Sequence, residues 1–334
     1  MSKNNAEHLR VLLAGGGSGG PVAPLIAVAQ AIKKYQPRVK FLLVGTKTGP
    51  EKQMTENASI DFVFISAGRW RRYWSLKNFF TPFLTLRGFF SAYRILRQFR
   101  PDCIFGAGSF VQVPVIWAGW LLKIPSVIHQ QDVSPSLANR LCEPCTKKIT
   151  VCFEKSLSDF YENLGLFYRH KTAEKVVQTG NPFRSELGNV KREKGLKNLN
   201  LRTDMPILLV LGGGTGADFI NRLVIKALPE LSRIVQIVHS TGVRTLQQIV
   251  RENYHPFNFI ADMASAYAAA DVVLSRAGLS TLTELANLGK VSIIIPMPET
   301  HQEYNAALLD EFRAALVFEQ KDVSAKGLVA VIRK

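Results

Sequence analysis

The sequence predicts an α/β fold of two doubly wound parallel-sheet domains that face each other across a cleft. One observation is a repeated pattern, at residues 9–20 and again at residues 207–216, in which an apolar run ends in a glycine-rich loop and a helical pattern follows. Glycine lets the backbone turn sharply and approach a ligand, and the N–H groups that open the next helix suit an anion. The other observation is the alternation of short apolar runs with helical patterns in both halves, which is typical of parallel sheets.

The expected strands follow from the short apolar runs. In the first half they are residues 11–14, 41–44, 62–65, 103–105, 126–129 and 148–152, and in the second half residues 207–211, 236–240, 257–260, 272–275 and 292–295. A helix is expected over residues 25–34, and a surface loop over residues 191–205, which are rich in Lys, Asn and Arg. Gly180 and Pro182 favour a boundary that separates residues 1–180 from residues 181–334.

Composition limits the class of protein. The 334 residues, 47% of them hydrophobic, suit about two globular domains, each with its own core. The polar N-terminus shows no signal peptide, and the apolar runs are shorter than the ~18 residues of a spanning helix, so we expect a cytoplasmic protein. The net charge of +16 predicts an anionic partner. Cys142 and Cys145 have the spacing of a zinc knuckle, but without a second pair we expect reduced, structural thiols.

Residues 69–100 contain many arginines and no acidic residue. The aromatic residues Trp70, Trp74, Phe79 and Phe80 lie just before the start of a predicted helix, and Arg87 lies within it. Aromatic side chains beside arginines suit the headgroup region of an anionic membrane. The alternatives are stacking on RNA and an ordinary solvated basic face.

Within that helix, Leu86, Phe90, Tyr93 and Leu96 recur at helical spacing. Such a stripe is typical of a face that packs in the core. We therefore expect all four side chains to be buried.

The glycine loops match the dinucleotide fingerprint only formally. The second expected strand ends without the carboxylate that would bind the ribose of NAD, the first acidic residue after it being Glu51, and neither loop has a Walker lysine. No Asp-x-Asp pair is present to hold a divalent ion. The residues thus predict a diphosphate site built from backbone N–H groups, a helix dipole and arginine, with no metal and no cofactor.

The second half has a more specific motif. Residues 275–284, Ser-Arg-Ala-Gly-Leu-Ser-Thr-Leu-Thr-Glu, follow an expected strand and enter a helix, which places hydroxyls and a glycine where a phosphate would bind. Glu284 lies just behind and is placed to accept hydrogen bonds from a ribose diol; the alternative is a capped helix with an exposed glutamate. Gln302 and Asn305 follow, and amide groups commonly bind sugar hydroxyls.

The order of these motifs resembles the MurG family, peripheral membrane glycosyltransferases of peptidoglycan synthesis. The matching segments are collinear over essentially the whole chain and lie at residues 15–24, 106–114, 124–131, 139, 179–184, 212–221, 259–263, 270–273, 276–284 and 302–306. The resemblance implies a GT-B fold, with two Rossmann-like domains. It also implies transfer of GlcNAc from UDP-GlcNAc to the muramyl C4 hydroxyl of lipid I, with inversion, at the cytoplasmic face of the membrane and without nucleic acid.

The resemblance also implies which residues bind substrate. The donor would meet Ile260 at uracil, Glu284 at ribose and Gln302 at the sugar. The diphosphate would meet Arg184, Leu279, Ser280, Thr281, Leu282 and Thr283, and Gly214 and Thr215 stand where the family's second loop contacts the donor. The acceptor would lie near Ser18, Gly19 and Gly20, and Asp132, Asn139 and Asn305 are further candidate substrate contacts.

This chain departs from the family in the first loop. Pro21 stands where the family has a histidine that is a candidate catalytic base, and proline can neither accept a proton nor donate a hydrogen bond. Asp132, with His129, is our hypothesis for the base; the alternative is that Asp132 caps a helix or binds a hydroxyl. We also expect the chain to end, at Lys334, before the C-terminal helix that in this fold crosses back to the first domain.

Other functions stay open at this point. The lost histidine favours a degenerate homologue that binds a sugar nucleotide without turnover, and the clustering of departures in the acceptor half favours a related transferase with another acceptor. A nucleotide-dependent oxidoreductase is disfavoured by the missing carboxylate at the end of the second strand.

Overall fold

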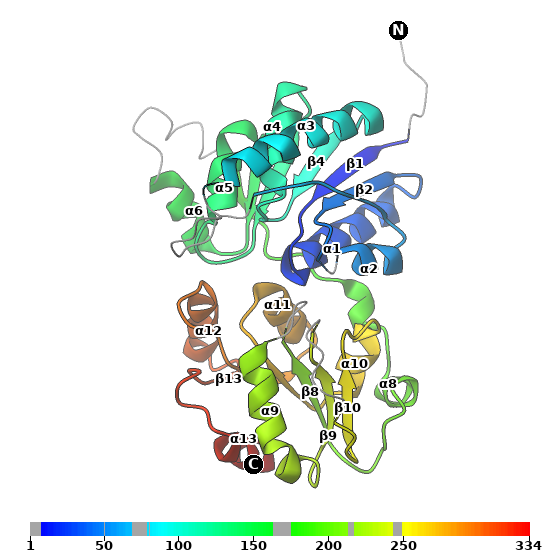
Figure 1. The fold of residues 1–334 in the computed structure, drawn as a ribbon, viewed down its shortest axis with the longest axis vertical. Coiled ribbons are helices and arrows are strands. Elements are labelled where there is room, and N and C mark those ends of the chain that lie inside the picture. Colours follow the sequence, from blue (N-terminus) through cyan, green and yellow to red (C-terminus); the bar gives the residue numbers. More distant parts are fainter. Residues whose placement is uncertain are drawn as a thin grey trace. The chain divides into compact units, whose positions relative to one another are not determined.

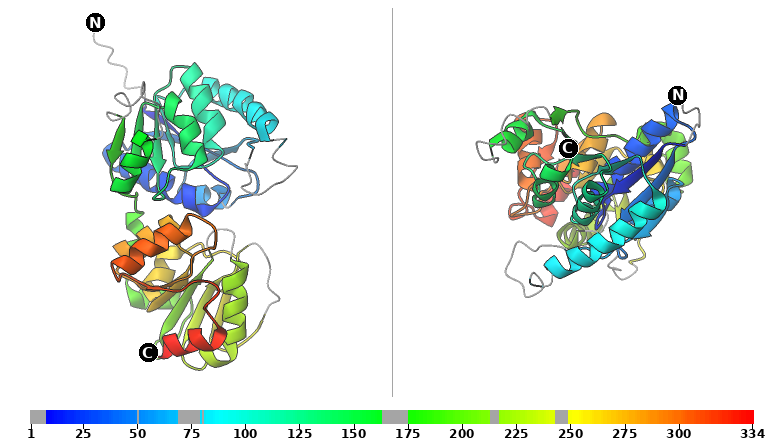
Figure 2. Two further views of the ribbon diagram at one scale, coloured as in Figure 1. Left: turned by 90° about the vertical axis from the view of Figure 1, so that its left-hand side faces the viewer. Right: turned by 90° about the horizontal axis from the view of Figure 1, so that it is seen from above.

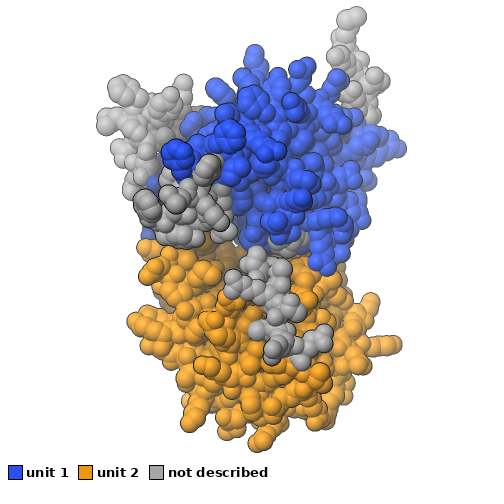
Figure 3. Space-filling view, in the orientation of Figure 1, with its two compact units in different colours: residues 1–182 blue, residues 183–334 orange. Residues whose placement is uncertain are grey.

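The computed structural model describes residues 8–49, 51–68, 79, 81–162, 175–212, 217–242 and 249–334 (Figure 1). The chain divides into two compact units, Met1–Pro182 and Phe183–Lys334 (Figure 3). Each unit contains one sheet in which all described strand pairs are parallel. The predicted fold class, two doubly wound α/β domains, is confirmed.

The first unit has a sheet of seven strands in the order β3-β2-β1-β4-β5-β6-β7. The strands are β1 (Arg10–Ala14), β2 (Lys40–Gly45), β3 (Asp61–Phe64), β4 (Cys103–Gly106), β5 (Ser126–Gln130), β6 (Lys148–Val151) and β7 (Val176–Gln178). The helices are α1 (Gly19–Tyr35), α2 (Glu51–Asn57), α3 (Thr81–Phe99), α4 (Gln112–Leu121), α5 (Leu137–Cys142) and α6 (Glu154–Glu162), with a 3₁₀ turn η2 (Glu143–Cys145).

Strand β1 shows how this sheet acquires two buried faces. Leu12 and Ala14 pack in the cluster under α3, α4 and α5, whereas Val11 and Leu13 pack against α1 and β2 on the other face. Alternate side chains of a strand point to opposite faces, so a strand covered on both sides reads as a continuous apolar run. Figure 2 shows helices on both faces of the sheet.

The second unit has six strands in the order β10-β9-β8-β11-β12-β13. They are β8 (Ile207–Leu211), β9 (Gln236–Ser240), β10 (Tyr254–Phe257), β11 (Val272–Ser275), β12 (Val291–Ile294) and β13 (Leu316–Val317). The helices are α8 (Arg192–Asn198), α9 (Asp218–Leu231), α10 (Met263–Ala269), α11 (Leu279–Asn287), α12 (Gln302–Glu311) and α13 (Ala325–Arg333), with a 3₁₀ turn η3 (Ser185–Gly188). Leu209 faces α8, α10 and α11, and its neighbour Leu208 faces α9 and α13.

Two expected elements are wrong. The strand expected at residues 257–260 ends at Phe257 and begins earlier, at Tyr254. Pro256 lies inside it, which a strand at the edge of a sheet tolerates. The loop expected at residues 191–205 contains α8, which packs against α10 so closely that a Cβ on Gly195 would press on the backbone of α10. The short edge strands β7 and β13 were not expected.

The apolar stripe on α3 is only partly buried. Leu96 is in the core and Tyr93 is half-buried, but Leu86 and Phe90 are 54% and 56% exposed. The expectation that all four residues pack in the core is therefore wrong for these two. The helix buries Gly88, Ala92 and Leu96 instead. Among the described residues, no helix is both long enough and apolar enough to span a membrane.

Candidate functional site

Most of the predicted substrate-binding residues that the structure describes lie near the carboxyl ends of the parallel strands. In the first unit, the loops after β1, β2, β4 and β5 all leave the same edge of the sheet. In the second unit, the loops after β8, β10, β11 and β12 do the same. Ligands of open α/β sheets bind at this edge, at the point where the strand order reverses. β1 and β4 flank that point in the first sheet, and β8 and β11 flank it in the second.

The first glycine loop ends at the N-terminus of α1. Gly17 has a φ of 84°, a left-handed conformation that glycine adopts without strain. Ser18 precedes the helix with an extended backbone and forms no side-chain capping bond, and the first turn contains no acidic residue. Pro21 lies in that turn, where proline is tolerated because no intrahelical donor is lost.

The loop is held from two sides. The Ser109 hydroxyl donates to the Gly16 carbonyl at 2.8 Å, and the ring of Phe110 packs where a Cβ on Gly17 would lie. On the other side is Glu51, a residue whose role the sequence did not predict.

Glu51 is completely buried. Its Oε1 accepts from the main-chain N–H of Gly17 and Thr46 and, at 2.7 Å, from the Thr46 hydroxyl. Its Oε2 has no hydrogen-bond partner among the described residues. A Cβ on Gly16 or Gly49 would collide with this carboxylate. The glycines here thus make room for a buried carboxylate that ties the first loop to the end of β2.

Asn139 lies inside a buried amide network. Its Nδ2 donates to the His129 carbonyl at 3.2 Å and to Gln130 Oε1, while Gln112 Nε2 donates to its Oδ1. Gln112 Oε1 accepts from Gly108 N–H at 3.0 Å. Asn139 has no exposed surface, so in this arrangement it holds the loops after β4 and β5 together, which differs from the predicted direct contact with substrate.

His129 is buried at the end of β5, with Nδ1 2.8 Å from Thr150 Oγ1 and Nε2 3.0 Å from Asn181 Oδ1. Burial lowers the pKa of His129, although hydrogen bonding to Asn181 and to the Thr150 backbone opposes the shift. Asp132 lies two residues beyond the strand and is partly exposed, and its carbonyl accepts from Gln130 Nε2 at 2.8 Å. Of the two predicted catalytic residues, only Asp132 has a side chain that reaches the surface.

The N-terminus of α11 is the open end of the second unit's site. Gly278 precedes the helix in an extended conformation, and a Cβ placed on it would meet no atom within 4 Å. Leu279, Ser280, Thr281 and Thr283 are partly exposed, whereas Leu282 is in the core. No acidic residue lies in the first turn, so its N–H groups and the helix dipole favour an anion.

Glu284, one turn further along α11, is buried and takes part in an ion pair. Arg184 donates from Nε at 3.2 Å and from Nη2 at 2.6 Å to Oε1, and the Tyr267 hydroxyl donates to Oε2 at 2.8 Å. The structure therefore brings together Arg184 and Glu284, which were predicted for different parts of the donor. No sequence motif indicated Tyr267.

Arg276 joins the loops after β11, β12 and β13. Its guanidinium donates to the carbonyls of Ile295 and Pro296 and to Gln320 Oε1. Asn305 is buried and donates to the Ala277 carbonyl at 3.1 Å, so it fixes the same loops from α12. Gln302 is partly exposed at the start of α12 and accepts from Met297 N–H.

Some predicted site residues have buried side chains, and others lie outside the described part of the chain. The Ile260 side chain is buried in the core, so a contact with uracil would come from its main chain. Gly214 and Thr215 lie outside the described residues, as do Trp70, Trp74 and Phe80. The described residues contain no group of three or more His, Cys, Asp or Glu side chains arranged to hold a metal ion.

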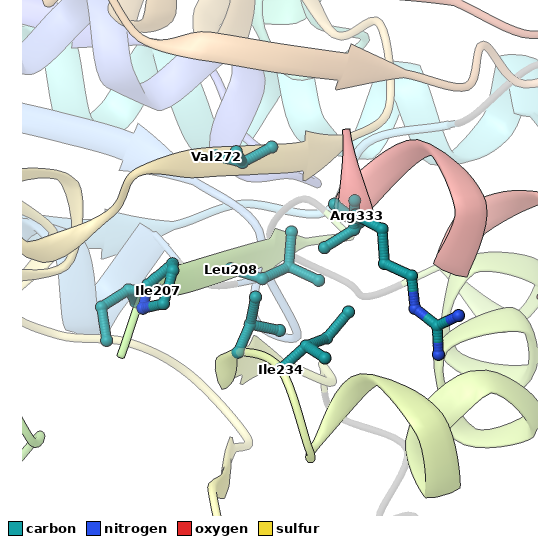
Figure 4. A pocket seen from close by; sticks show the side chains of 8 residues that line it. Ile207, Leu208, Ile234, Val272 and Arg333 are labelled. Carbon is teal, nitrogen blue, oxygen red and sulfur yellow. The ribbon is translucent and has the colours of Figure 1, made fainter. Parts of the chain in front are cut away.

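Two pockets lie away from these edges. One of about 270 Å³ is lined by Ile207, Val235 and Val272, at the amino ends of β8, β9 and β11, and by Arg333 (Figure 4). The other, of about 400 Å³, is lined by Arg10 and Lys40 at the amino ends of β1 and β2. Both lie at the sheet edge opposite to the glycine loops, so we do not assign substrate to them.

The outer face of α3 is apolar and basic. Phe83 is 68% exposed and Phe79, just before the helix, is 85% exposed, beside the exposed Leu86 and Phe90. Arg87, Arg94 and Arg97 are also exposed on this helix. We call this surface, from Phe79 to Arg97, the α3 face.

The fold agrees with the comparisons to known proteins. Residues 11–151 match the glycosyltransferase family 28 N-terminal domain, and residues 207–334 match the glycosyltransferase family 28 C-terminal domain. The chain is therefore a glycosyltransferase with the GT-B fold. A UDP-GlcNAc 2-epimerase from Neisseria meningitidis, solved with UDP-GlcNAc, shares the fold, with a TM-score of 0.67 at 15% identity over 97% of this chain and 91% of that chain.

The relatives define the family more closely. UDP-N-acetylglucosamine–N-acetylmuramyl-(pentapeptide) pyrophosphoryl-undecaprenol N-acetylglucosamine transferases from Clostridium kluyveri and Caldanaerobacter subterraneus are 34% and 36% identical. They are matched over 97% and 96% of this chain and 90% and 89% of theirs. The crystal structure of Acinetobacter baumannii MurG has a TM-score of 0.62 at 25% identity, covering 98% of this chain and 90% of that chain. The chain belongs to the MurG family.

Proposed function

We propose that this protein transfers GlcNAc from UDP-GlcNAc to the C4 hydroxyl of the muramyl sugar of lipid I, which yields lipid II for peptidoglycan synthesis. The observation that carries the proposal is the open N-terminus of α11 above the buried Glu284, in a chain that matches the named transferases over 97% of its length. An anion-binding helix end next to a fixed carboxylate suits the diphosphate and ribose of a nucleotide sugar.

The second unit would bind the donor. The N–H groups at the start of α11 would hold the diphosphate, and Gln302 on α12 would contact the GlcNAc hydroxyls. Asn305 and Arg276 keep the surrounding loops in place through buried hydrogen bonds. Because a helix N-terminus stabilises the charge that develops on a departing diphosphate, we expect transfer without a divalent metal.

The first unit would bind the acceptor, with its diphosphate near Ser18, Gly19 and Gly20 at the start of α1. Asp132 would take the proton of the C4 hydroxyl. The hydroxyl oxygen then bonds to C1 of GlcNAc on the face opposite to UDP, and the bond between C1 and the diphosphate oxygen breaks, so the anomeric centre inverts. The buried and doubly bonded His129 supports this role less well than Asp132.

The test is the transfer of radiolabelled GlcNAc from UDP-GlcNAc to a soluble lipid I analogue, in EDTA and in Mg²⁺. We expect equal product in both and a rate that falls by about 10²–10⁴-fold in Asp132→Asn, the usual contribution of a positioned base. Asp159→Asn, in α6, is the matched control and should retain the wild-type rate. Unchanged turnover in Asp132→Asn would remove Asp132 from the mechanism.

A second candidate function rests on Pro21. A homologue that binds a sugar nucleotide without turnover would suit a loop in which a proline replaces the family's histidine. Both candidates predict UDP binding by titration calorimetry, and only the wild-type protein's turnover of a lipid I analogue separates them. No product with wild type, together with UDP binding, would favour the binding protein.

We further propose that the α3 face rests on the cytoplasmic surface of the membrane, where lipid I lies. Exposed Phe83 and Phe90 beside Arg87 and Arg94 combine apolar area with positive charge, the two features that hold an amphipathic helix at an anionic membrane. Co-sedimentation with phosphatidylglycerol vesicles should be lost in the Phe83→Ser/Phe90→Ser double variant. Tyr35→Ser, which removes a still more exposed aromatic on α1, is the control.

A further inference from the structure

The ribose contact proposed for Glu284 requires a carboxylate with a defined orientation, and the structure shows what sets it. Tyr267, on α10, is 1% exposed, and its hydroxyl donates to Glu284 Oε2 at 2.8 Å. Arg184, at the start of η3, donates two N–H groups to Oε1. We propose that Tyr267, together with Arg184, is a positioning residue that fixes Glu284 for hydrogen bonding to the ribose and thereby sets a preference for ribose over deoxyribose.

The orientation of the Glu284 carboxylate depends on its last side-chain torsion. The last side-chain torsion of glutamate has a broad, two-fold profile, so a free carboxylate rotates readily. Here each oxygen has its own donor, and the two donors come from different elements, which stops that rotation. A carboxylate has about four acceptor positions, and three are used, so acceptor capacity remains on Oε2 beside the Tyr267 bond.

Tyr267 and Arg184 must both be protonated to act as donors. Burial, with the charge of Glu284, raises the pKa of Tyr267 well above its usual value, so the hydroxyl keeps its proton and remains a donor. The pKa of Arg184 is also raised, because Glu284 outweighs the opposing effect of burial. Both partners are therefore donors, and both Glu284 oxygens act as acceptors. Ribose hydroxyls are the donors that such a group recognises.

The three side chains of this network belong to one unit of the protein. Tyr267 packs in the same core cluster as Ile260 and Leu285, and Arg184 and Glu284 belong to the same unit as Tyr267. The position of the carboxylate thus depends on this unit alone. A site that is built to hydrogen-bond a hydroxyl rejects an analogue that lacks it, because a buried polar group is left without its partner.

The experiment measures binding of UDP, 2′-deoxy-UDP and 3′-deoxy-UDP by titration calorimetry. The ratio of deoxy-UDP to UDP dissociation constants isolates the ribose, because all three ligands carry the same diphosphate and any contact of Arg184 with it cancels. For wild type we expect at least one deoxy analogue to bind about ten- to a hundredfold more weakly, the usual effect of one hydrogen bond to a charged group. In Tyr267→Phe and in Arg184→Lys the ratio should fall to about threefold or less.

Tyr254→Phe is the matched control. Tyr254 is also buried in the second unit, and its hydroxyl lies 3.0 Å from His239 Nδ1, so the variant loses a similar hydrogen bond without touching Glu284. It should be destabilised like Tyr267→Phe but keep the wild-type ratio. If Tyr267→Phe does not fold, Arg184→Lys, whose side chain is 17% exposed, carries the test from the other oxygen.

The inference rests on the proposed function, and the outcomes separate the two. Wild type that does not bind UDP would contradict the proposed donor site itself. Wild type that binds UDP and both deoxy analogues equally well would remove the ribose role from Glu284. A wild-type ratio that survives in both Tyr267→Phe and Arg184→Lys would overturn the positioning role and leave the transferase proposal standing.

Discussion

Each unit buries one glutamate at the carboxyl edge of its sheet, and the two are held in contrasting ways. Glu51, in the first unit, bonds to two main-chain N–H groups and one hydroxyl, and no cation among the described residues pairs with it. Glu284, in the second unit, bonds to the guanidinium of Arg184 and the hydroxyl of Tyr267. Both are buried, at 0% and 7% exposure.

The contrast suggests two uses of a buried carboxylate. Bonded to main-chain N–H groups, Glu51 fixes the backbone of the first glycine loop and leaves that loop's own surface to interact with a ligand. Bonded to side chains, Glu284 is itself fixed, and its spare acceptor capacity can recognise a ligand. Removing the first should therefore disturb a loop, and removing the second should disturb both an ion pair and a binding contact.

The largest expected effect follows from Glu284→Ala. Removing one partner of a buried ion pair leaves the other charge uncompensated and typically costs about 3–5 kcal/mol. Arg184 would lose its ion-pair partner among the described residues, and Tyr267 would lose its acceptor. We expect the free energy of unfolding of the second unit in urea to fall by that amount, as measured by hydrogen exchange. We also expect the variant to lose UDP binding.

Glu311→Ala, at the exposed end of α12, is the control for that variant and should change neither quantity. A Glu284→Ala protein as stable as wild type would mean that the ion pair contributes no net stability. The contrast with Glu51 would then rest on ligand binding alone.

A pH titration extends the comparison to buried histidines. Burial lowers the pKa of His239 from 6.5 to about 4, and its ring nitrogens lie 3.0 Å from Tyr254 and Asn221. The unfolded chain takes up this proton near pH 6.5 and the folded unit only near pH 4, so stability is complete above pH 6.5 and falls between these values. The loss should reach about 3 kcal/mol at 1.36 kcal/mol per unit.

Hydrogen exchange in β9 measures this loss in the second unit, and tryptophan fluorescence follows the first unit, because all four tryptophans lie there. His239→Gln should flatten the pH dependence in β9. A slope that persists in this variant would assign the effect to another group.

The elements of the fold differ in how well the sequence predicts them. The strands β8, β9 and β11 have the bounds that their apolar runs predict, since hydrophobic periodicity is a local property. The bounds predicted for edge strand β10 were wrong because Pro256, which is unusual in a strand, lies inside it. Helix α8 was missed because its burial depends on packing against α10. Tertiary packing overrides local composition in such segments.

The same limit applies to the site. Glu284 and Asp132 each come after a strand in the sequence, and that order alone predicts a position at the carboxyl edge of the strand's own sheet. Tyr267 and Glu51 act through partners 17 and 34 residues away, so no local pattern indicates them. One clue to Glu51 was present: glycines at positions 16 and 49 leave room for a side chain that only the fold reveals.

Glu51→Ala tests the first half of the comparison. Three donors would lose their acceptor, so we expect a loss of about 2 kcal/mol in the stability of the first unit. The acceptor KM should rise and the donor KM should not, the reverse of the pattern in Glu284→Ala. Glu51→Gln keeps one carbonyl acceptor and should retain most activity, and the exposed Glu56→Ala, on the same helix, is the control. A donor KM that rises equally in Glu51→Ala would indicate general damage and remove the specific role in the first loop.

The smallest structural change is the replacement of a glycine by alanine. Two glycines in the loops after strands differ in what a Cβ placed on them would contact. A Cβ on Gly278 would meet open space, and its φ of −72° suits any residue, so Gly278→Ala should leave the unfolding free energy within about 0.5 kcal/mol of wild type. A Cβ on Gly16 would strike the Glu51 carboxylate, so Gly16→Ala should lose about 1–3 kcal/mol through overpacking. The methyl of Gly278→Ala would nevertheless stand at the N-terminus of α11, where we place the donor diphosphate, and we expect the donor KM to rise several-fold with no loss of stability. An unchanged donor KM in this stable variant would contradict a diphosphate site at the N-terminus of α11, and with it the ribose contact of Glu284.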